Sequence, residues 1–244
     1  MIALFSDFGL AGPYTGQVRA VIHARAPGVP VVDLMADAPA YRIRAAAHLL
    51  AALVAPFPEG SVFLCVVDPG VGTDRREPVF YRVDGRWFVG PGNGLFDVVA
   101  ARGRQAEAWR VDWRPERLSR SFHGRDLFAP VAAMLATGET VPATRLALEP
   151  ETLAPAADDL PEILYLDGFG NAISGIRGDA VSDRAVIAAA GRRLDHAPTF
   201  GAVDTGDAFW YRNALGLVEI AVNQGSAAAE LGLEVGDAVE IEAA

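Results

Sequence analysis

Strand-like and helix-like segments alternate along the first 138 residues, and this alternation limits the possible folds more than any other feature of the sequence. Buried strands are predicted at 2–6, 29–34 and 61–67, and helices are predicted to open at Pro13 and to run over 43–54. The third strand is almost continuously apolar, as expected for a strand that is covered on both faces. These segments predict an α/β domain with a mainly parallel sheet over residues 1–150.

The same part of the chain contains one clear hairpin signal. Segments 78–83 and 86–89 flank Asp84-Gly85, a dipeptide typical of two-residue hairpin turns. Further helices are predicted at 95–101 and 125–137, and Gly138 is placed to end the second one.

The pattern changes after residue 138. Prolines recur between 139 and 161 with little periodicity, which predicts a linker or a long surface crossing. Short strands separated by glycines follow, at 162–166, 185–189, 208–211, 216–222 and 237–241. This texture predicts a smaller C-terminal domain over 160–244 that is all-β and resembles a barrel.

Charge and residue usage exclude several classes of function. The formal charge of −10 makes a nucleic-acid partner unfavourable, because phosphate binding needs clustered cations. All 21 basic residues are arginine, so a lysine Schiff base and a P-loop lysine are both excluded. Cys65 stands alone, which rules out a disulfide or a thiolate zinc cluster within one chain. We expect Cys65 to be a small buried hydrophobe.

No segment predicts attachment to a membrane. The residues after Met1 lack a basic n-region, and the longest apolar helix candidate, 45–55, is too short to span a bilayer. We therefore expect a soluble cytoplasmic protein.

Two glycine-interrupted loops carry the residues that we expect to do chemistry. Asp68 ends the third predicted strand and precedes a tight loop with Arg75, whereas His123 lies in a second loop where a helix starts. A carboxylate, a guanidinium and an imidazole in such loops suggest a general base with its orienting partners. The simpler alternatives are a surface ion pair for Asp68 and a structural role for the histidine. His123 favours the first interpretation, because the N–H groups of a helix start disfavour an imidazolium.

Polar side chains at another strand end and in a turn are candidates for binding. Asp7 follows the first strand, at the edge of a parallel sheet where ligands gather, and could accept hydrogen bonds from a hydroxyl pair or merely cap the next turn. Asp167 and Asn171 flank Phe169 in a glycine-containing segment that suits a ribose or a purine, or forms an ordinary β-turn.

The strand 216–222 adds further candidates. Asn213 and Asn223 bracket this strand and could hydrogen-bond a base edge, whereas Glu219 within it is expected to face outward. The four histidines have no ligand spacing, so no metal site is expected.

Seven motifs occur in order across nearly the whole chain: Ser6-Asp7-Phe8-Gly9, Pro13-Tyr14 with Gly16, 67–73 with Arg75-Arg76, Gly90-Pro91 with Asn93-Gly94, 122–130, Phe169-Gly170-Asn171, and 219–225. Each motif alone is common, but the ordered set resembles the S-adenosylmethionine (SAM) hydroxide adenosyltransferases. That family is related to the bacterial fluorinases and chlorinases.

The resemblance implies an N-terminal α/β domain, a C-terminal β-barrel and a homotrimer with sites between neighbouring subunits. It also implies hydrolysis of SAM to adenosine and methionine. On the family pattern Asp68, Arg75 and His123 form the catalytic set, and Asp7 contacts the ribose. The remaining substrate-binding positions, near methionine and adenine, fall on Asp167, Asn171, Asn213, Glu219, Val222 and Asn223.

Some positions depart from the family pattern and keep alternatives open. Ala36 replaces a histidine that is common in this region of relatives. Gly12 and Gly92 stand where relatives often carry polar residues, which leaves a non-catalytic adenosine or SAM sensor as one alternative. A chlorinase-like halide adenosyltransferase is another, but halogenating relatives have tyrosine in place of Asp68, so water is the better nucleophile here. A hydrolase of other nucleosides is supported only by the acidic residues at strand ends.

The expected reaction is attack of water at the ribose C5′ carbon, which displaces the thioether of methionine from a sulfonium cation. Asp68 would orient or deprotonate the water, Arg75 would stabilise hydroxide character, and His123 would complete the hydrogen-bond set. Because the leaving group departs uncharged, neither a metal nor a cofactor is expected.

Overall fold

The structure is a computed structural model that describes residues 1–73 and 76–242. The chain divides into two compact units. The first contains Met1–Leu50 and Pro56–Ala157, and the second contains Ala51–Ala55 and Asp158–Ala244. Each unit is described by itself below.

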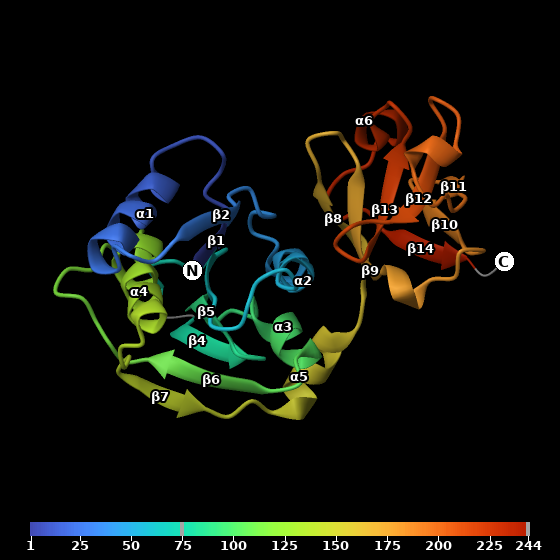
Figure 1. Cartoon of the computed structure of the whole chain (residues 1–244). Helices are drawn as coiled ribbons and strands as arrows, with labels where there is room; N and C mark the ends of the chain where they lie inside the picture. The colour runs from blue at the N-terminus through green and yellow to red at the C-terminus, as the bar shows by residue number, and fades with distance from the viewer. Residues whose placement is uncertain (74–75, 243–244) are drawn as a thin grey trace. The chain divides into compact units, whose positions relative to one another are not determined.

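A seven-stranded sheet in the order β2-β1-β3-β5-β4-β6-β7 organises the first unit (Figure 1). The strands are β1 (Ile2–Ser6), β2 (Val31–Met35), β3 (Val62–Val66), β4 (Pro78–Val83), β5 (Arg86–Pro91), β6 (Ala106–Val111) and β7 (Ala143–Leu146). The pairs β1–β2, β1–β3 and β3–β5 are parallel. Strand β4 is antiparallel to both β5 and β6, so β6 runs in the same direction as β5, and the sheet is mainly parallel as predicted.

Helices cover this sheet on both sides. They are α1 (Tyr14–Arg25), α2 (Ile43–Leu53), α3 (Asp97–Arg102), α4 (Ala129–Thr137) and α5 (Pro150–Ala157). In Figure 1, α1 and α4 lie together on one side of the sheet, and α2 and α3 lie on the other. The core beneath α1 and α4 is formed by alternate strand residues and by apolar helix residues, among them Ile2, Leu4, Val62, Leu64, Val18, Ile22, Val131 and Ala132.

From Leu160 onwards the second unit is all-β apart from short helical segments. Its sheets are β12-β13-β9-β8 and β11-β10-β14, and all of their pairings are antiparallel. The strands are β8 (Leu160–Leu166), β9 (Ala172–Arg177), β10 (Val186–Ala189), β11 (Arg192–Leu194), β12 (Ala208–Arg212), β13 (Leu217–Val222) and β14 (Val239–Glu242). The helical segments are 3-10 turns at Gly178–Ala180 and Phe200–Ala202, and helix α6 (Ala227–Leu231).

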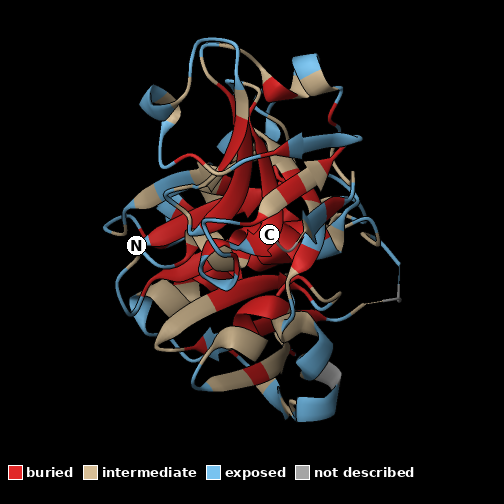
Figure 2. Cartoon of the chain, turned by 90° about the vertical axis from the view of Figure 1, so that its right-hand side faces the viewer, coloured by how far each residue is buried: buried red, intermediate tan, exposed pale blue. Residues whose placement is uncertain are grey.

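The core of the second unit lies between its sheets. It contains Ile163, Ile187, Trp210, Ile220 and Val239, all nearly inaccessible to solvent. Buried residues of the chain are red in Figure 2, and many of them lie in strands. Isolated bridges join Glu162 to Ala238 and His196 to Trp210, between edge segments of the two sheets. Closure into the expected barrel stays a prediction.

The structure corrects the expectation of a linker over 139–161. Strand β7 lies there at the edge of the large sheet, paired with β6, and helix α5 begins at Pro150. A proline at the first position of a helix leaves no hydrogen bond unmade, because that N–H has no partner within the helix. Pro150 therefore did not exclude a helix, although Pro150 and Pro155 together hid it.

Other differences concern elements that the sequence did not reveal. Strands β6, β9 and β11 and helix α6 were not expected. The helix predicted at 125–137 begins with a π-turn over Gly124–Phe128 and continues as α4 up to Gly138, whose φ of 77° ends it in the left-handed conformation. None of the helices in the described part of the chain is long and apolar enough to cross a membrane.

Candidate active site

The two aspartates that follow β1 and β3 lie side by side at the carboxyl ends of these strands. The strands pair in parallel, with Ser6 opposite Val66, so the residues that follow them leave the sheet at the same edge. The backbone N–H of Asp7 donates to the carbonyl oxygen of Val66 over 3.2 Å. Parallel pairing thus brings Asp7 close to Asp68, although 61 positions separate them in the chain.

Asp68, Arg76 and His123 form a connected hydrogen-bond group at this edge. The Nε of Arg76 donates to Oδ1 of Asp68 over 3.1 Å, and its Nη2 donates to Oδ2 of the same carboxylate. Nη2 also lies 3.0 Å from Nδ1 of His123. The side chains of Arg76 and Asp68 are each only 5% exposed, so this two-pronged ion pair is shielded from water.

The arginine in this group is Arg76, which the sequence pattern did not single out. The predicted catalytic Arg75 lies outside the described residues. The guanidinium of Arg76 also lies over the ring of Phe128, 5.6 Å from its centre, within range of a cation–π contact. Sequence spacing from Asp68 gave no means of separating two adjacent arginines.

The contact with Arg76 fixes the protonation of His123. A guanidinium has only donors, so Nδ1 of His123 must accept, and the proton of the neutral ring then sits on Nε2. Burial lowers the pKa of His123 below its usual value, and the positive charge of Arg76 lowers it further. His123 is therefore a neutral imidazole near pH 7, with an Nε2–H that can donate.

Asp7 has a different electrostatic environment. Burial raises the pKa of Asp7 above its usual range, and the neighbouring carboxylate of Asp68 adds to the rise. Arg76 neutralises Asp68, whereas Asp7 takes part in none of the ion pairs between described residues. The negative charge of Asp7 is thus available to donors on a ligand.

All of these residues except Arg76 line a cavity of about 630 Å³ in the first unit. This volume is within the range of small-molecule sites. Asp7, Asp68 and His123 contribute polar groups to its wall. The rings of Phe8, Tyr14 and Phe122 contact one another edge-on or tilted, with centres 5.4–6.0 Å apart, and supply an apolar wall that the sequence pattern did not reveal.

Two loops hold the carboxyl end of β3 in place. Gly72 has a φ of 76°, and a Cβ there would collide with the carbonyl oxygen of Arg120, so only glycine fits this position. Nδ2 of Asn93 donates to the carbonyl oxygen of Val67 over 2.9 Å. The glycine-rich segment after β5 therefore fastens the backbone next to Asp68.

The predicted binding residues of the second unit are described within that unit alone. Asp167 organises its own loop: Oδ1 accepts from the N–H groups of Phe169 and Asn171, and Oδ2 accepts from Nδ2 of Asn171, all within 3.0 Å. The ring of Phe169 stands 82% exposed at the tip of this loop. The structure thus brings Asp167 and Asn171 together around a projecting aromatic ring.

Glu219 is buried, which corrects the expectation of an outward-facing side chain. Its Oε1 accepts from the hydroxyl group of Tyr211 over 2.5 Å, and its Oε2 accepts from Nδ2 of Asn213 over 2.7 Å. Tyr211 lies directly opposite Glu219 across β12 and β13, so strand alternation could have indicated it. Burial raises the pKa of Tyr211, and the hydrogen bond to Glu219 adds to the rise.

The last two predicted residues have separate surroundings. The side chain of Val222 is packed in the core of the second unit. Nδ2 of Asn223 donates to the carbonyl oxygen of Val203 over 2.9 Å, which ties β13 to the loop after the 3-10 turn. This bond leads away from the Tyr211–Glu219–Asn213 group, so Asn223 is held independently of it.

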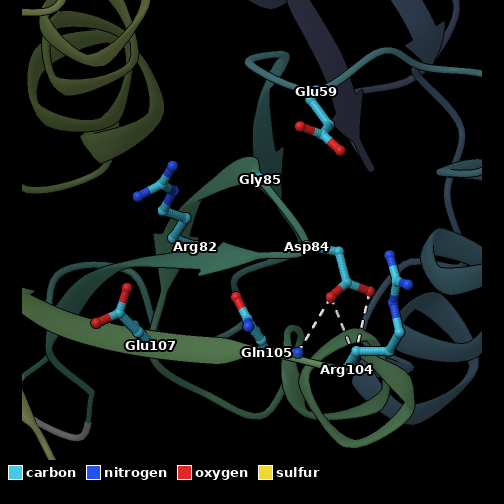
Figure 3. Close-up of a pocket in the computed structure, with 7 residues that line it drawn as sticks. All are labelled: Glu59, Arg82, Asp84, Gly85, Arg104, Gln105 and Glu107. Carbon is cyan, nitrogen blue, oxygen red and sulfur yellow. Dashed lines mark hydrogen bonds between the residues drawn. The ribbon is translucent and has the colours of Figure 1, made fainter.

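A second cavity lies at the opposite edge of the large sheet, around the turn between β4 and β5. Its volume is about 470 Å³, and its lining is mostly charged, as Figure 3 shows: Glu59, Arg82, Asp84, Gly85, Arg104, Gln105 and Glu107. The carboxylate of Asp84 accepts from the backbone N–H groups of Arg104 and Gln105 (Figure 3). These bonds fasten the hairpin, and most of the lining side chains are exposed.

Within residues 1–73 and 76–242, no cluster of three or more histidine, cysteine or acidic side chains is arranged to hold a metal ion.

Comparison with known proteins identifies the family. Residues 2–145 match the model of the SAM hydroxide adenosyltransferase N-terminal domain, and residues 161–240 match that of the C-terminal domain. The chain belongs to the SAM hydroxide adenosyltransferase family. Similar family members include proteins named (R)-S-adenosyl-L-methionine hydrolase. The one from Thermus thermophilus is 39% identical and the one from Salinispora tropica is 36% identical; the matches cover 98% and 99% of this chain and 98% and 97% of theirs.

A solved structure supports the family fold over the whole chain. The crystal structure of an uncharacterized conserved protein from Thermotoga maritima superimposes with a TM-score of 0.87 at 32% identity, covering 99% of both chains. Proteins named fluorinase are more distant. The one from Actinopolyspora mzabensis is 25% identical over 99% of this chain and 96% of its own length.

Proposed function

We propose that this protein hydrolyses S-adenosyl-L-methionine to adenosine and L-methionine by attack of water at the ribose C5′ carbon. The observation that carries the proposal is the hydrogen-bonded group of Asp68, Arg76 and His123, part of which lines a cavity. The names of the similar SAM hydrolases support the choice of substrate.

The roles of the three residues follow from their hydrogen bonds. Asp68 uses one lone pair of each oxygen for Arg76 and keeps others for a water molecule, because each carboxylate oxygen has two. His123 carries its proton on Nε2, so it donates to the water oxygen and does not take its proton. Asp68 is then the group that receives the proton of water as the new C5′–O bond forms.

Arg76 takes the role that the family resemblance gave to Arg75. It holds the Asp68 carboxylate in one orientation and fixes the tautomer of His123. A positioned base contributes about 10²–10⁴-fold to a rate, and holding the water in line behind C5′ contributes more.

The charge of the substrate suits this site. SAM carries a sulfonium cation, and the C5′–S electron pair returns to sulfur as the bond breaks, so methionine leaves as a neutral thioether. A shielded site favours this loss of charge. The ionised carboxylate of Asp7 is proposed to accept hydrogen bonds from the ribose hydroxyl groups. Because the leaving group is neutral, we propose that no metal or cofactor takes part.

The second unit is proposed to bind the adenine and methionine ends of the substrate. Asn171 and Asn223 would offer amide groups, Phe169 a stacking ring, and Val222 an apolar backbone segment. In the Tyr211–Glu219–Asn213 group both carboxylate oxygens are occupied, so Glu219 would orient its neighbours. The two edge bridges support a barrel, and we propose a homotrimer with sites between neighbouring subunits.

The test is a product assay. Purified protein is incubated with SAM, and adenosine and methionine are separated by chromatography; equal release of both supports the proposal. Tight calorimetric binding of SAM without any product would instead support a sensor. A 5′-halo-5′-deoxyadenosine formed in the presence of chloride or fluoride would support halide transfer and contradict hydrolysis as the main reaction.

A further inference from the structure

The turn that carries His123 is wider than an α-helical turn. The N–H of Ala129 donates to the carbonyl oxygen of Gly124, five residues earlier, and Gly124–Phe128 form a π-turn. Only from Ala129 onwards does the chain continue as an ordinary α-helix. π-turns are rare and occur often at functional sites, so the cause of this one matters.

Pro130 lies just after this turn. It is buried and occupies the second position of α4. Proline has no N–H, and in an uninterrupted α-helix its ring would clash with the carbonyl group four residues earlier, that of Asp126. The regular α-helical bond between 130 and 126 is therefore impossible, and the chain before Pro130 adopts a wider turn.

The wider turn determines which side chains of this segment face Arg76. His123 and Phe128 both contact Arg76, one through Nδ1 at 3.0 Å and the other through its ring at 5.6 Å. They are five residues apart. In an α-helix, with 3.6 residues per turn, residues five apart point about 140° away from each other around the axis. A π-turn closes one residue later, so residues five apart return to nearly the same side.

We infer that Pro130 is a positioning residue, because the π-turn it enforces puts His123 and Phe128 on the same side, where both hold Arg76 against Asp68. The inference rests on the proposed function only for its effect on rate. Its structural part concerns the surroundings of His123, which can be measured without substrate.

The experiment replaces Pro130 with alanine, which restores an N–H able to bond to Asp126. The matched control is Pro155→Ala: Pro155 also lies within a helix, α5, but it is exposed and does not line the cavity. The titration of His123 is followed by NMR, with a His123→Gln variant to assign its signal among the four histidines.

The charged groups that influence His123 are Asp68, Arg76, Asp126 and Arg114. In the wild type its pKa is expected below the ordinary value of about 6.5. In Pro130→Ala it should rise towards that value as the ring leaves Arg76. The kcat should fall about 10²-fold, the effect of a displacement of about 1 Å. Because protonation of Nδ1 breaks its hydrogen bond with Arg76, the acid limb of the pH profile of kcat should also move upwards with the pKa of His123. Pro155→Ala should leave all three measurements unchanged.

An unchanged titration of His123 in Pro130→Ala overturns the inference, whether or not the rate falls. So does a Pro130→Ala chain that no longer folds, because a restored helix hydrogen bond should not unfold the segment. If the wild type releases no adenosine, the proposed function fails, and the titration still decides the role of Pro130.

Discussion

The two edges of the large sheet both carry charged side chains around a cavity, but they differ in burial and in hydrogen bonding. At the carboxyl ends of β1 and β3, the side chains of Asp68 and Arg76 are each 5% exposed, and Arg76 also hydrogen-bonds to His123. At the hairpin edge, Asp84 uses its carboxylate to bind the backbone N–H groups of the next loop, and most other charges there are exposed (Figure 3).

Charged side chains around a cavity do not by themselves make a reactive site. The carboxylate of Asp84 is used to close a turn, whereas Asp68 lines the cavity and its carboxylate is held in one orientation by a guanidinium. The field of a charge is also stronger where water is excluded. We therefore expect chemistry at the first edge and a purely structural role at the second.

The largest expected effect comes from Asp68→Asn, compared with Asp84→Asn. The first change keeps the volume of the side chain but removes the base, so turnover should fall about 10²–10⁴-fold while adenosine still binds. The second should leave turnover within a factor of about two, because the hairpin lies at the far edge. Steady-state release of adenosine measures both, and calorimetry checks binding. Equal losses of turnover in the two variants would show that Asp68 has no special role in the reaction.

A smaller effect is expected from Arg76→Lys, compared with Arg75→Lys. A lysine cannot donate to both oxygens of Asp68 and to His123 in the fixed geometry of a guanidinium, so Arg76→Lys should reduce kcat about 10–100-fold. We expect a smaller loss of kcat in Arg75→Lys. Steady-state kinetics of both variants compare the two losses. The reverse order of the two losses would restore Arg75 as the catalytic arginine.

The smallest effect is expected from Asp7→Asn, and it has opposite signs for stability and binding. Because the pKa of Asp7 is raised in the folded protein, ionisation of Asp7 lowers the free energy of unfolding. This loss of stability grows as the pH rises from the ordinary pKa of the carboxyl group to the raised pKa. At pH 7 the variant should melt a few degrees higher than the wild type. At a pH below the ordinary carboxyl range this gain should vanish.

The same variant should show a higher KM for SAM, since an amide is a poorer acceptor than a carboxylate for two ribose hydroxyl groups. Thermal unfolding at both pH values and steady-state kinetics measure the two effects. A melting temperature that falls equally at both pH values would show that Asp7 has a structural role instead.

The sequence predicted the core of the first unit because each of its signals was local. The apolar run of β3, the Asp84-Gly85 turn and the glycine at position 138 each determine structure within a few residues, and each prediction is confirmed. Strand β7 and helix α5 were missed because their local signals are absent or misleading. β7 has only four residues and depends on pairing with β6, and the prolines of α5 usually indicate a break in a helix.

The sequence predicted the part of the site that lies at the ends of strands. Parallel strands end at a shared edge, so the strand pattern alone could place Asp7 and Asp68 together. The choice between Arg75 and Arg76 depends on the path of one loop, and the partner of His123 depends on a π-turn caused by a proline seven residues later. Neither leaves a periodic signal in the sequence.

The central claim is that water, oriented by Asp68, attacks C5′. The most direct measurement is the reaction of SAM in water enriched in ¹⁸O, with both products analysed by mass spectrometry. Attack of water at C5′ puts one ¹⁸O atom in the 5′-hydroxyl group of adenosine and none in methionine. Adenosine without the label, or label in the methionine portion, would contradict it.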